Sequence, residues 1–354
     1  MTADGSGSLP QFAYQRRPVR VVFRVGALES VRAEIDRAGF ERSLLVATPG
    51  RSTVVQRLAD ALGSGIAGVF NRAALHVPLS LVADALAEVE RTGARSVVTI
   101  GGGSAIGLGK AIAHHAGLPV AAIPTTYSGS EMTEIWGYTD EHGKKTLREA
   151  AVAPAIVIYD PALTLDLSPA TSGASGMNAA AHAVEALYAA DANPVSTLVS
   201  EEALRGLGRS LPAVVARPGD LAARTDALRA AHLAGVALDA TSMGLHHKLA
   251  HVLGGTFGLS HAETHATLLP HVVAFNEPAA PDAMQRIAAA LGASTATEGI
   301  RALGRAAGIT YGLGDLGLKR DDLDRAAAIA AATTYPNPRA VTREAVLEIL
   351  ERAY

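Results

Sequence analysis

Residues 96–110 have the sequence SVVTIGGGSAIGLGK, in which an apolar run meets a cluster of glycines. The β-branched run Ser96–Ile100 predicts a buried strand, and the residues after the glycines predict a helix. Glycines in such a turn let the backbone approach a ligand closely, and the first turn of the helix offers free N–H groups to a phosphate. The stretch therefore predicts a phosphate cradle in an α/β domain, with a purely structural turn as the alternative.

Two common nucleotide-binding fingerprints do not match this turn. The G-x-G-x-x-G pattern fails at Ile106, and the P-loop pattern fails because Ser104 and Ala111 stand where a glycine and a Ser/Thr belong. A second small polar cluster, Thr125–Glu131, follows the next predicted strand. Clusters at the carboxyl ends of neighbouring parallel strands line one crevice, where open α/β sheets bind ligands. The two clusters together favour the phosphate cradle.

Strands and helices alternate on both sides of this stretch. The same patterns predict strands at 20–23, 43–48, 67–70, 120–123 and 155–159, and helices at 28–38, 53–62 and 79–92. Alternation of this kind is typical of parallel βαβ units with right-handed crossovers.

After Asp160 the pattern changes to alanine-rich segments with helical periodicity, such as 174–190, 196–205 and 221–239. We therefore predict a disordered lead-in at 1–10, a parallel α/β domain at 11–161 and an all-helical domain at 162–354.

Composition excludes several classes of function. The chain has 354 residues, a formal charge of −3 and no cysteine. A nearly neutral chain without basic blocks argues against nucleic acid or an anionic membrane as partner, and no apolar run reaches the length of a membrane span. Without cysteine there is no disulfide and no thiolate ligand or nucleophile. A soluble cytoplasmic protein is expected.

Six of the twelve histidines lie between His246 and His271. His247 and His251 are four residues apart, so in a helix they share one face. This concentration suggests a metal site. Two alternatives remain open, namely a metal-free polar active site and structural histidines in a helical core.

Several motifs together resemble one family. IGGGSAIGLGKAIA (100–113), PTTYSGSEMT (124–133), VIYDPALT (157–164), SGMNAAAHAVEALYA (175–189), GLHHKLAHVLGGTFGLSHAETHATLLPH (244–271) and YPNPR (335–339) occur in this order. They are similar to the iron-containing alcohol dehydrogenase superfamily, and within it to the maleylacetate reductase branch. The resemblance implies a Rossmann-like domain that binds NADH or NADPH, a helical domain, and catalysis between them.

The resemblance also implies which residues contact the cofactor. The pyrophosphate is expected at Gly101, Gly102, Gly103 and Ser104, the nicotinamide side at Thr125, Thr126 and Ser130, and the nicotinamide ribose at Lys144 or Lys145 and Leu163. Near the adenosine ribose, Thr48-Pro49 stand where many relatives carry an acidic residue. An acid there would bind the ribose hydroxyls and repel a 2′-phosphate. Its absence, with Arg51 nearby, leaves both NADH and NADPH open.

Metal-dependent members of the superfamily use an Asp and three His, and the matching positions here are Asn178, His182, His251 and His261. Asn178 is the informative departure, because a neutral amide offsets none of the charge of a divalent cation. Three histidines alone can hold zinc, but Lys248 beside them opposes a cation. We therefore expect no metal, as the maleylacetate reductase branch implies.

A metal-free reduction still has to stabilise the enolate that hydride transfer builds on a dicarboxylate substrate. His182, His247, Lys248, His251 and His261 are the candidates for that task, and one histidine is expected to supply a proton. Tyr335 and Asn337 are candidate donors to a substrate carboxylate. Arg339 is either a carboxylate clamp or plain surface charge, and His265 and His271 are expected farther from the substrate.

The function expected is reduction of maleylacetate to 3-oxoadipate by a homodimer. The alternatives are a metal-dependent alcohol or hydroxyacid dehydrogenase of the same superfamily, and a non-catalytic nucleotide-binding protein. The retained His/Lys cluster argues against the last of these.

Overall fold

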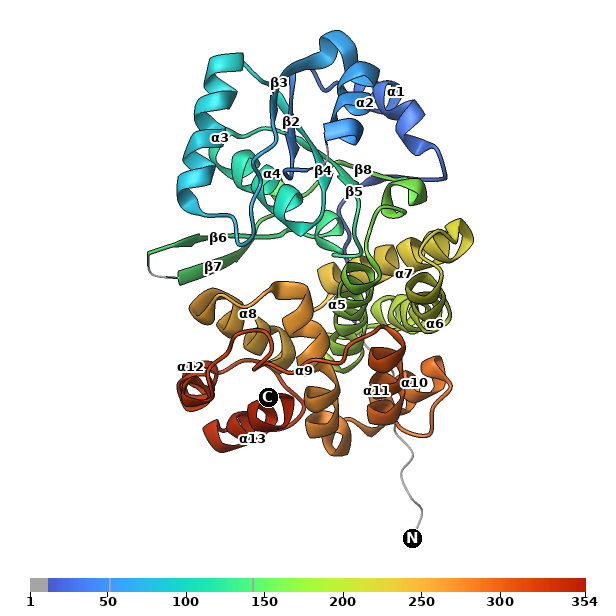
Figure 1. Cartoon of the computed structure of the whole chain (residues 1–354), viewed down its shortest axis with the longest axis vertical. Coiled ribbons are helices and arrows are strands. Elements are labelled where there is room, and N and C mark those ends of the chain that lie inside the picture. The colour runs from blue at the N-terminus through green and yellow to red at the C-terminus, as the bar shows by residue number, and fades with distance from the viewer. Residues whose placement is uncertain (1–11, 51, 142) are drawn as a thin grey trace.

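The computed structural model describes residues 12–50, 52–141 and 143–354. The predicted lead-in at 1–10 and Arg51 lie outside the described residues. Figure 1 shows an α/β domain, coloured blue to green, stacked on a helical domain coloured green to red. The fold class predicted from the sequence is confirmed.

The larger sheet of the α/β domain has six parallel strands in the order β1-β8-β5-β4-β2-β3. Their bounds are Arg20–Phe23 (β1), Ser43–Ala47 (β2), Ile66–Phe70 (β3), Ser96–Gly101 (β4), Val120–Pro124 (β5) and Ile156–Tyr159 (β8). Each agrees with its predicted strand to within about a residue. The carboxyl ends of β4 and β5 are neighbours, with Gly101 opposite Pro124, so the two polar clusters that follow them come together.

Helices cover both faces of this sheet. They are α1 (Val31–Arg37), α2 (Ser52–Leu62), α3 (Leu79–Thr92) and α4 (Gly103–Ala116). Successive side chains of β2 alternate between the two faces: Leu44 and Val46 pack with the α3 and α4 side, whereas Leu45 and Ala47 pack with the α1 and α2 side. Burial on both faces explains why these strands are continuous apolar runs rather than alternating ones.

A second sheet, not predicted from the sequence, is the antiparallel hairpin of β6 (Ile135–Asp140) and β7 (Gly143–Arg148). Most of its side chains are at least partly exposed, and it lacks the buried apolar run that marked the other strands. Figure 1 shows the hairpin extending from the α/β domain above helix α8. It therefore brings residues of the first domain to the surface of the second.

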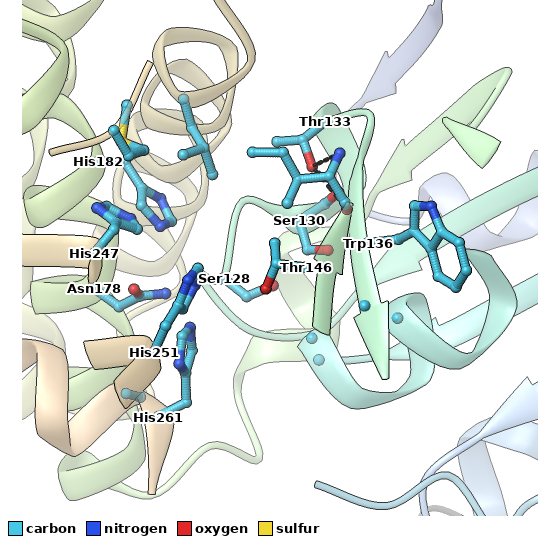
Figure 2. Close-up of a pocket in the computed structure, with 18 of the residues that line it drawn as sticks. Ser128, Ser130, Thr133, Trp136, Thr146, Asn178, His182, His247, His251 and His261 are labelled. Carbon is cyan, nitrogen blue, oxygen red and sulfur yellow. Dashed lines mark hydrogen bonds between the residues drawn. The ribbon is translucent and has the colours of Figure 1, made fainter. Parts of the chain in front are cut away.

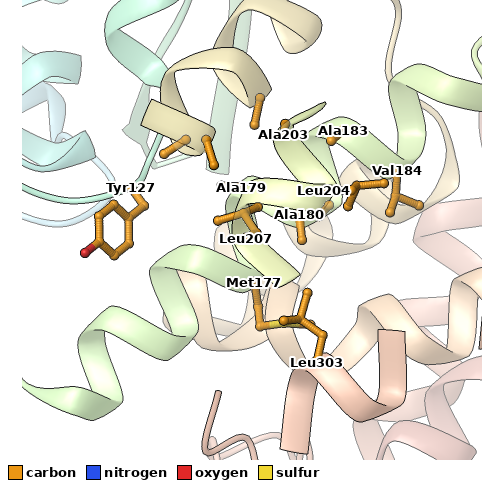
Figure 3. Packing of buried hydrophobic residues seen from close by; sticks show 14 of the residues in the cluster. Tyr127, Met177, Ala179, Ala180, Ala183, Val184, Ala203, Leu204, Leu207 and Leu303 are labelled. Carbon is orange, nitrogen blue, oxygen red and sulfur yellow. The ribbon is translucent and has the colours of Figure 1, made fainter. Parts of the chain in front are cut away.

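The helical domain contains α5 (Pro169–Tyr188), α6 (Pro194–Ala216), α7 (Leu221–Ala240), α8 (Leu245–Phe257), α9 (His261–Asn276), α10 (Pro281–Leu291), α11 (Ala296–Ala306), α12 (Leu323–Ala331) and α13 (Arg343–Ala353). In α5, the residues from Ser172 to Leu187 are buried. Figure 3 shows its alanines, such as Ala180 and Ala183, packed near Leu204 and Leu207 of α6. Small side chains let these helices approach closely, which places α5 at the centre of the domain.

Among the described residues, no helix is both long enough and apolar enough to cross a membrane.

Candidate active site

A cavity of about 1110 Å³ lies in the cleft between the two domains, and both domains line it. Figure 2 shows its two walls: Asn178, His182, His247, His251 and His261 come from the helices, and Ser128, Ser130 and Thr146 face them from the α/β domain. The cleft therefore joins the two parts of the chain that the sequence singled out.

The glycine-rich turn forms the α/β wall. Gly102, Gly103 and Ser104 line the cavity at the start of α4, whose N-cap residue provides no side-chain cap. Free N–H groups of this first helical turn suit a phosphate. A Cβ added at Gly102 would come within 2.9 Å of Thr126, whereas one added at Gly103 would meet only ordinary contacts with Ser128, at 3.7 Å or more. The turn therefore fits the pyrophosphate of a dinucleotide, and Gly103 leaves open space for it.

The other residues predicted to bind the cofactor divide into two groups. Thr48, Thr126, Ser130 and Lys144 line the cavity. Gly101, Thr125, Pro49, Lys145 and Leu163 do not line it.

Lys145 is outside the cleft because successive side chains of a strand point to opposite faces. It pairs instead with Asp140 at 2.6 Å, so Lys144 is the lysine of this pair that reaches the cavity. Leu163 is buried in the apolar cluster that contains α1 and α2.

Lys110, the lysine of the glycine-rich motif, does not act as a P-loop lysine. Its side chain is fully buried, and its Nζ donates to the carbonyl oxygens of Ser130 (2.6 Å), Thr133 (2.8 Å) and Ile135 (2.8 Å) and to the hydroxyl of Thr133 (3.0 Å). Burial lowers its pKa to about 7. Lys110 thus anchors the segment that carries Ser130 into the cleft.

Three helices form the opposite wall. Asn178 and His182 come from α5, His247, Lys248 and His251 from α8, and His261 from α9. The rings of His182 and His247 stack with centroids 5.2 Å apart, and those of His251 and His261 stack at 6.2 Å. The predicted catalytic residues on these helices therefore lie together.

His265 and His246 complete the cluster behind this wall. The His265 ring lies 4.4 Å from that of His261 and 4.8 Å from that of His247, measured between centroids. His246 Nε2 and His265 Nδ1 are 2.8 Å apart. His265 is thus buried at the centre of the cluster and does not line the cavity, as expected. His271 is partly exposed near the end of α9.

Glu185, which was not predicted from the sequence, holds this cluster in place. Its carboxylate lies 2.5 Å from His247 Nδ1 and accepts the backbone N–H groups of Gly244 (3.2 Å), His246 (2.9 Å) and His247 (3.3 Å). The spacing Asn178, His182, Glu185 is i, i+4, i+7, which places the three on one helix face. That periodicity was the signal available in the sequence.

Burial governs the protonation of the cluster. It lowers the pKa of His182, His251, His261 and His265 well below the usual value, and that of His246 to about 3. Burial alone would raise the pKa of Glu185, but the hydrogen bond and positive charge of His247 and the N–H donors outweigh it and the pKa falls. Among the histidines of the cluster, His247 is the one whose ring contacts this ionised carboxylate. The Nε2 atom of His247 has no hydrogen-bond partner in the protein.

The positions that match the family's metal ligands do not fit a divalent cation here. Asn178 is neutral, and Lys144 and Lys248 add positive charge to the same cavity. In the described part of the chain, no three His, Cys, Asp or Glu side chains are arranged to hold a metal ion. The buried Asn178 Oδ1 and His182 Nδ1 have no partner in the protein, which leaves them available to a polar ligand.

Of the three candidate substrate-binding residues in the C-terminal YPNPR loop, one lines the cavity. Tyr335 lines the cavity, and burial raises its pKa to about 12. Asn337 instead exchanges hydrogen bonds with Asn276, at 2.8 and 3.1 Å. Arg339 lies over the ring of Phe275 and donates to the Phe275 carbonyl oxygen. Neither Asn337 nor Arg339 lines the cavity. Asn337 is therefore not placed as a donor to the substrate, and Arg339, which is exposed, agrees with the surface-charge alternative.

Comparison with known proteins gives matches over nearly the whole chain. The family model described as iron-containing alcohol dehydrogenase matches residues 18–161, and that described as Fe-containing alcohol dehydrogenase family, C-terminal, matches residues 172–354. Maleylacetate reductase from Burkholderia cepacia is 50% identical over 343 residues, which cover 97% of each chain. The solved structure of maleylacetate reductase from Agrobacterium tumefaciens has a TM-score of 0.93 at 44% identity, covering 98% of this chain and 99% of that one. That of the enzyme from Rhizobium sp. strain MTP-10005 has a TM-score of 0.92 at the same identity and coverage.

Proposed function

The chain belongs to the iron-containing alcohol dehydrogenase family. From its similarity to maleylacetate reductases we infer that it is an oxidoreductase that reduces maleylacetate to 3-oxoadipate with NADH or NADPH. The structural observation that carries this proposal is the cleft itself, in which a glycine cradle faces a cluster of histidines with no carboxylate at position 178. Residues 11–161 would bind the dinucleotide and residues 162–354 would supply the catalytic side chains.

The dinucleotide would lie along the α/β wall. Gly102, Gly103, Ser104 and the first turn of α4 would hold the pyrophosphate, with Gly101 shaping the turn behind them. Thr126 and Ser130 would line the nicotinamide side, and Thr48 the adenosine side. No acid at Thr48-Pro49 opposes a 2′-phosphate, so NADH and NADPH are both candidates for this site. The bound nicotinamide supplies the hydride.

The helical wall would stabilise the charge that develops on the substrate. Reduction of the conjugated double bond adds a hydride to the alkene carbon next to the carboxylate, leaves an enolate on the ketone, and ends when the other alkene carbon takes a proton. The enolate oxygen needs donors in a water-poor cleft, and Asn178, His182, His251, His261 and Tyr335 line that space.

His247 is the residue we assign to hold the proton. Glu185 fixes its ring through Nδ1 and carries the negative charge that stabilises an imidazolium, while Nε2 is free of protein partners. Burial keeps the neighbouring histidines neutral, so they act as hydrogen-bonding groups.

We further propose that the reaction needs no metal, because the donor set does not fit one. The homodimer and the cytoplasmic location expected from the sequence stay predictions.

One assay tests the function and its metal independence. NADH and NADPH absorbance would be followed with maleylacetate and with simple ketones, before and after chelation, beside metal analysis of the purified protein. We expect turnover of maleylacetate that survives chelation. No turnover with either cofactor contradicts the function. Activity that is abolished by chelation and restored by Fe²⁺ or Zn²⁺ favours the metal-dependent dehydrogenase instead.

A further inference from the structure

The YPNPR loop, residues 335–339, connects α12 to α13 in the helical domain. Residues 333–341 form no helix or strand, and in the part of the chain that the structure describes no backbone hydrogen bond fixes them. A second cavity, of about 510 Å³, lies beside the loop and is lined by Pro336, Asn337 and Pro338. The loop therefore has free space on one side, and side-chain contacts have to hold it.

Two such contacts attach the loop to the end of α9. Asn337 Nδ2 donates to Asn276 Oδ1 at 2.8 Å, and Asn276 Nδ2 donates to Asn337 Oδ1 at 3.1 Å. Arg339 donates to the carbonyl oxygen of Phe275 at 3.2 Å and lies over the Phe275 ring, 4.4 Å from its centroid. Asn337 Nδ2 also donates to the Arg339 carbonyl oxygen at 2.7 Å, which joins the two contacts. Both contacts reach the last turn of the same helix.

Tyr335 is the residue that this attachment places in the cleft. Its ring packs with the apolar cluster of α8, α9, α12 and α13, and its buried hydroxyl has no partner in the protein. An unpaired buried hydroxyl is costly unless a ligand completes its hydrogen bond. Burial, together with the negative charge of Glu185, raises the pKa of Tyr335 to about 12, so the phenol keeps its proton and can donate it to a hydrogen bond.

The loop also packs against the helices that carry the histidines of the site. Helix α9, to which it is attached, begins with His261, which lines the cleft. A Cβ added at Gly244, the residue before α8, would come within 2.9 Å of the Pro336 carbonyl oxygen. His247 follows Gly244 by three residues in α8. The attachment of the loop therefore fixes the position of Tyr335 relative to both helices.

We propose that Asn337 and Arg339 are positioning residues, which hold the Tyr335 hydroxyl in the cleft where it donates to an oxygen of the substrate. This inference rests on the proposed function and gives the YPNPR motif a task without direct contact between these two residues and the substrate. Asn337 is the main anchor, because its partner Asn276 is fully buried. Arg339 is exposed, and a cation–π contact at an exposed site contributes less.

A double-mutant cycle between Asn337 and Tyr335 tests the proposal. The variants are Asn337→Ala, Tyr335→Phe and their combination, with Thr295→Ala as the control. Thr295 caps α11 by accepting the N–H of Glu298 and does not line the cleft, so its loss lowers stability alone. We expect each single loop variant to lose roughly tenfold in kcat/KM for maleylacetate, with the dissociation constant of NADH unchanged.

The combination decides whether Asn337 acts through Tyr335. In the Tyr335→Phe background, Asn337→Ala should cost less than about twofold, because the hydroxyl that it positions is already gone. Arg339→Ala should lose about two- to fivefold in wild type and follow the same pattern. Losses that multiply in the combined variant, or a wild-type kcat/KM in either single variant, overturn the proposal. A loss in Thr295→Ala as large as that in Asn337→Ala also overturns it, because general destabilisation would then explain both.

Fluorine NMR of Tyr335 separates this inference from the proposed function. Protein labelled with 3-fluorotyrosine has eight labelled positions, and the signal missing from Tyr335→Phe belongs to Tyr335. In Asn337→Ala this signal should move towards the shift of solvent-exposed tyrosine, whereas Thr295→Ala should leave it in place. If the signal moves but wild type does not reduce maleylacetate, the function is wrong and the anchor stands. If wild type reduces maleylacetate and the signal stays in place, the positioning proposal is wrong and the function stands.

Discussion

At the scale of single residues, Glu185 makes His247 differ from its neighbours. The carboxylate is fully buried, contacts His247 Nδ1 and caps the start of α8. A single side chain therefore both orients the α8 backbone and provides charge to one ring.

Replacing Glu185 with Gln tests this role. The amide keeps the shape and can still accept N–H groups, but it removes the charge that stabilises a proton on His247. We expect kcat to fall roughly 10- to 100-fold, as for loss of a charged hydrogen bond, while the dissociation constant of NADH is unchanged. Steady-state kinetics and a cofactor titration measure both, with exposed Glu351→Gln as the control. A wild-type kcat in Glu185→Gln would remove the carboxylate from the mechanism.

Lys110 supports a second prediction at this scale. In Lys110→Met the carbonyl groups of Ser130, Thr133 and Ile135 lose their shared donor. Unsatisfied buried groups of this kind should lower the free energy of unfolding by about 3 kcal/mol. Urea denaturation measures the change, and an unchanged midpoint would show that water replaces the ammonium.

The residues of the site were only partly predictable from the sequence. His247 and His261 were found because histidines are dense between positions 246 and 271, and His182 because the family resemblance supplied it. Glu185 was missed because its partner lies 62 positions away in the chain, and the role of Arg339 stayed open because its stacking on Phe275 is a tertiary contact. Pairings across such distances leave no mark in a local pattern.

At the scale of elements, the turn from β4 into α4 determines where the cofactor can bind. Gly103 has room for a Cβ within the protein itself. The fold therefore does not require a glycine at position 103. We expect the missing side chain to leave space for a ligand instead.

The variant Gly103→Ala should therefore change cofactor affinity without changing stability. We expect the melting temperature to stay near that of wild type and the NADH affinity to fall about tenfold, the effect of roughly 1.4 kcal/mol, with a larger loss in Gly103→Val. Gly304→Ala in α11 is the matched control, since its added Cβ would also meet only ordinary contacts, at 3.7 Å. Unchanged NADH affinity in Gly103→Ala would contradict the cradle.

The elements themselves differ in how well the sequence predicted them. Strands buried on both faces, such as β2 and β4, are continuous apolar runs and were predicted to within a residue. The β6–β7 hairpin was missed because a ribbon with exposed, charged residues such as Lys145 and Arg148 lacks that signal. The hairpin lies against α8 at Gly255, where an added Cβ would come within 2.7 Å of Lys144 Cβ, and no local sequence pattern reveals this contact.

At the scale of the whole molecule, buried histidines make stability depend on pH. Burial lowers the pKa of His232 and His271 from 6.5 to about 4 and that of His246 to about 3. Below pH 6.5 these histidines bind protons in the unfolded chain but stay neutral in the folded protein. The free energy of unfolding therefore falls as the pH falls from 6.5 towards 4. Each such histidine contributes about 1.4 kcal/mol per pH unit within this window.

His271→Gln isolates one of these contributions, because His271 lies outside the cleft-lining residues. Urea denaturation of this variant between pH 6.5 and 5 should show a slope smaller by about one proton than that of wild type. An identical slope would mean that His271 titrates alike in the folded and unfolded states.

The hairpin also carries the single tryptophan of the chain, Trp136, buried beside the cleft with its ring 4.4 Å from that of His114. Figure 2 shows it on the side of the hairpin away from the histidines. All tryptophan fluorescence of the protein therefore originates from one residue, on the hairpin that packs against α8. Because reduced nicotinamide absorbs light at the wavelengths that tryptophan emits, a dinucleotide bound in the cleft should quench this emission by energy transfer. The intrinsic fluorescence of Trp136 should therefore report how much of the protein has bound cofactor, with no label added.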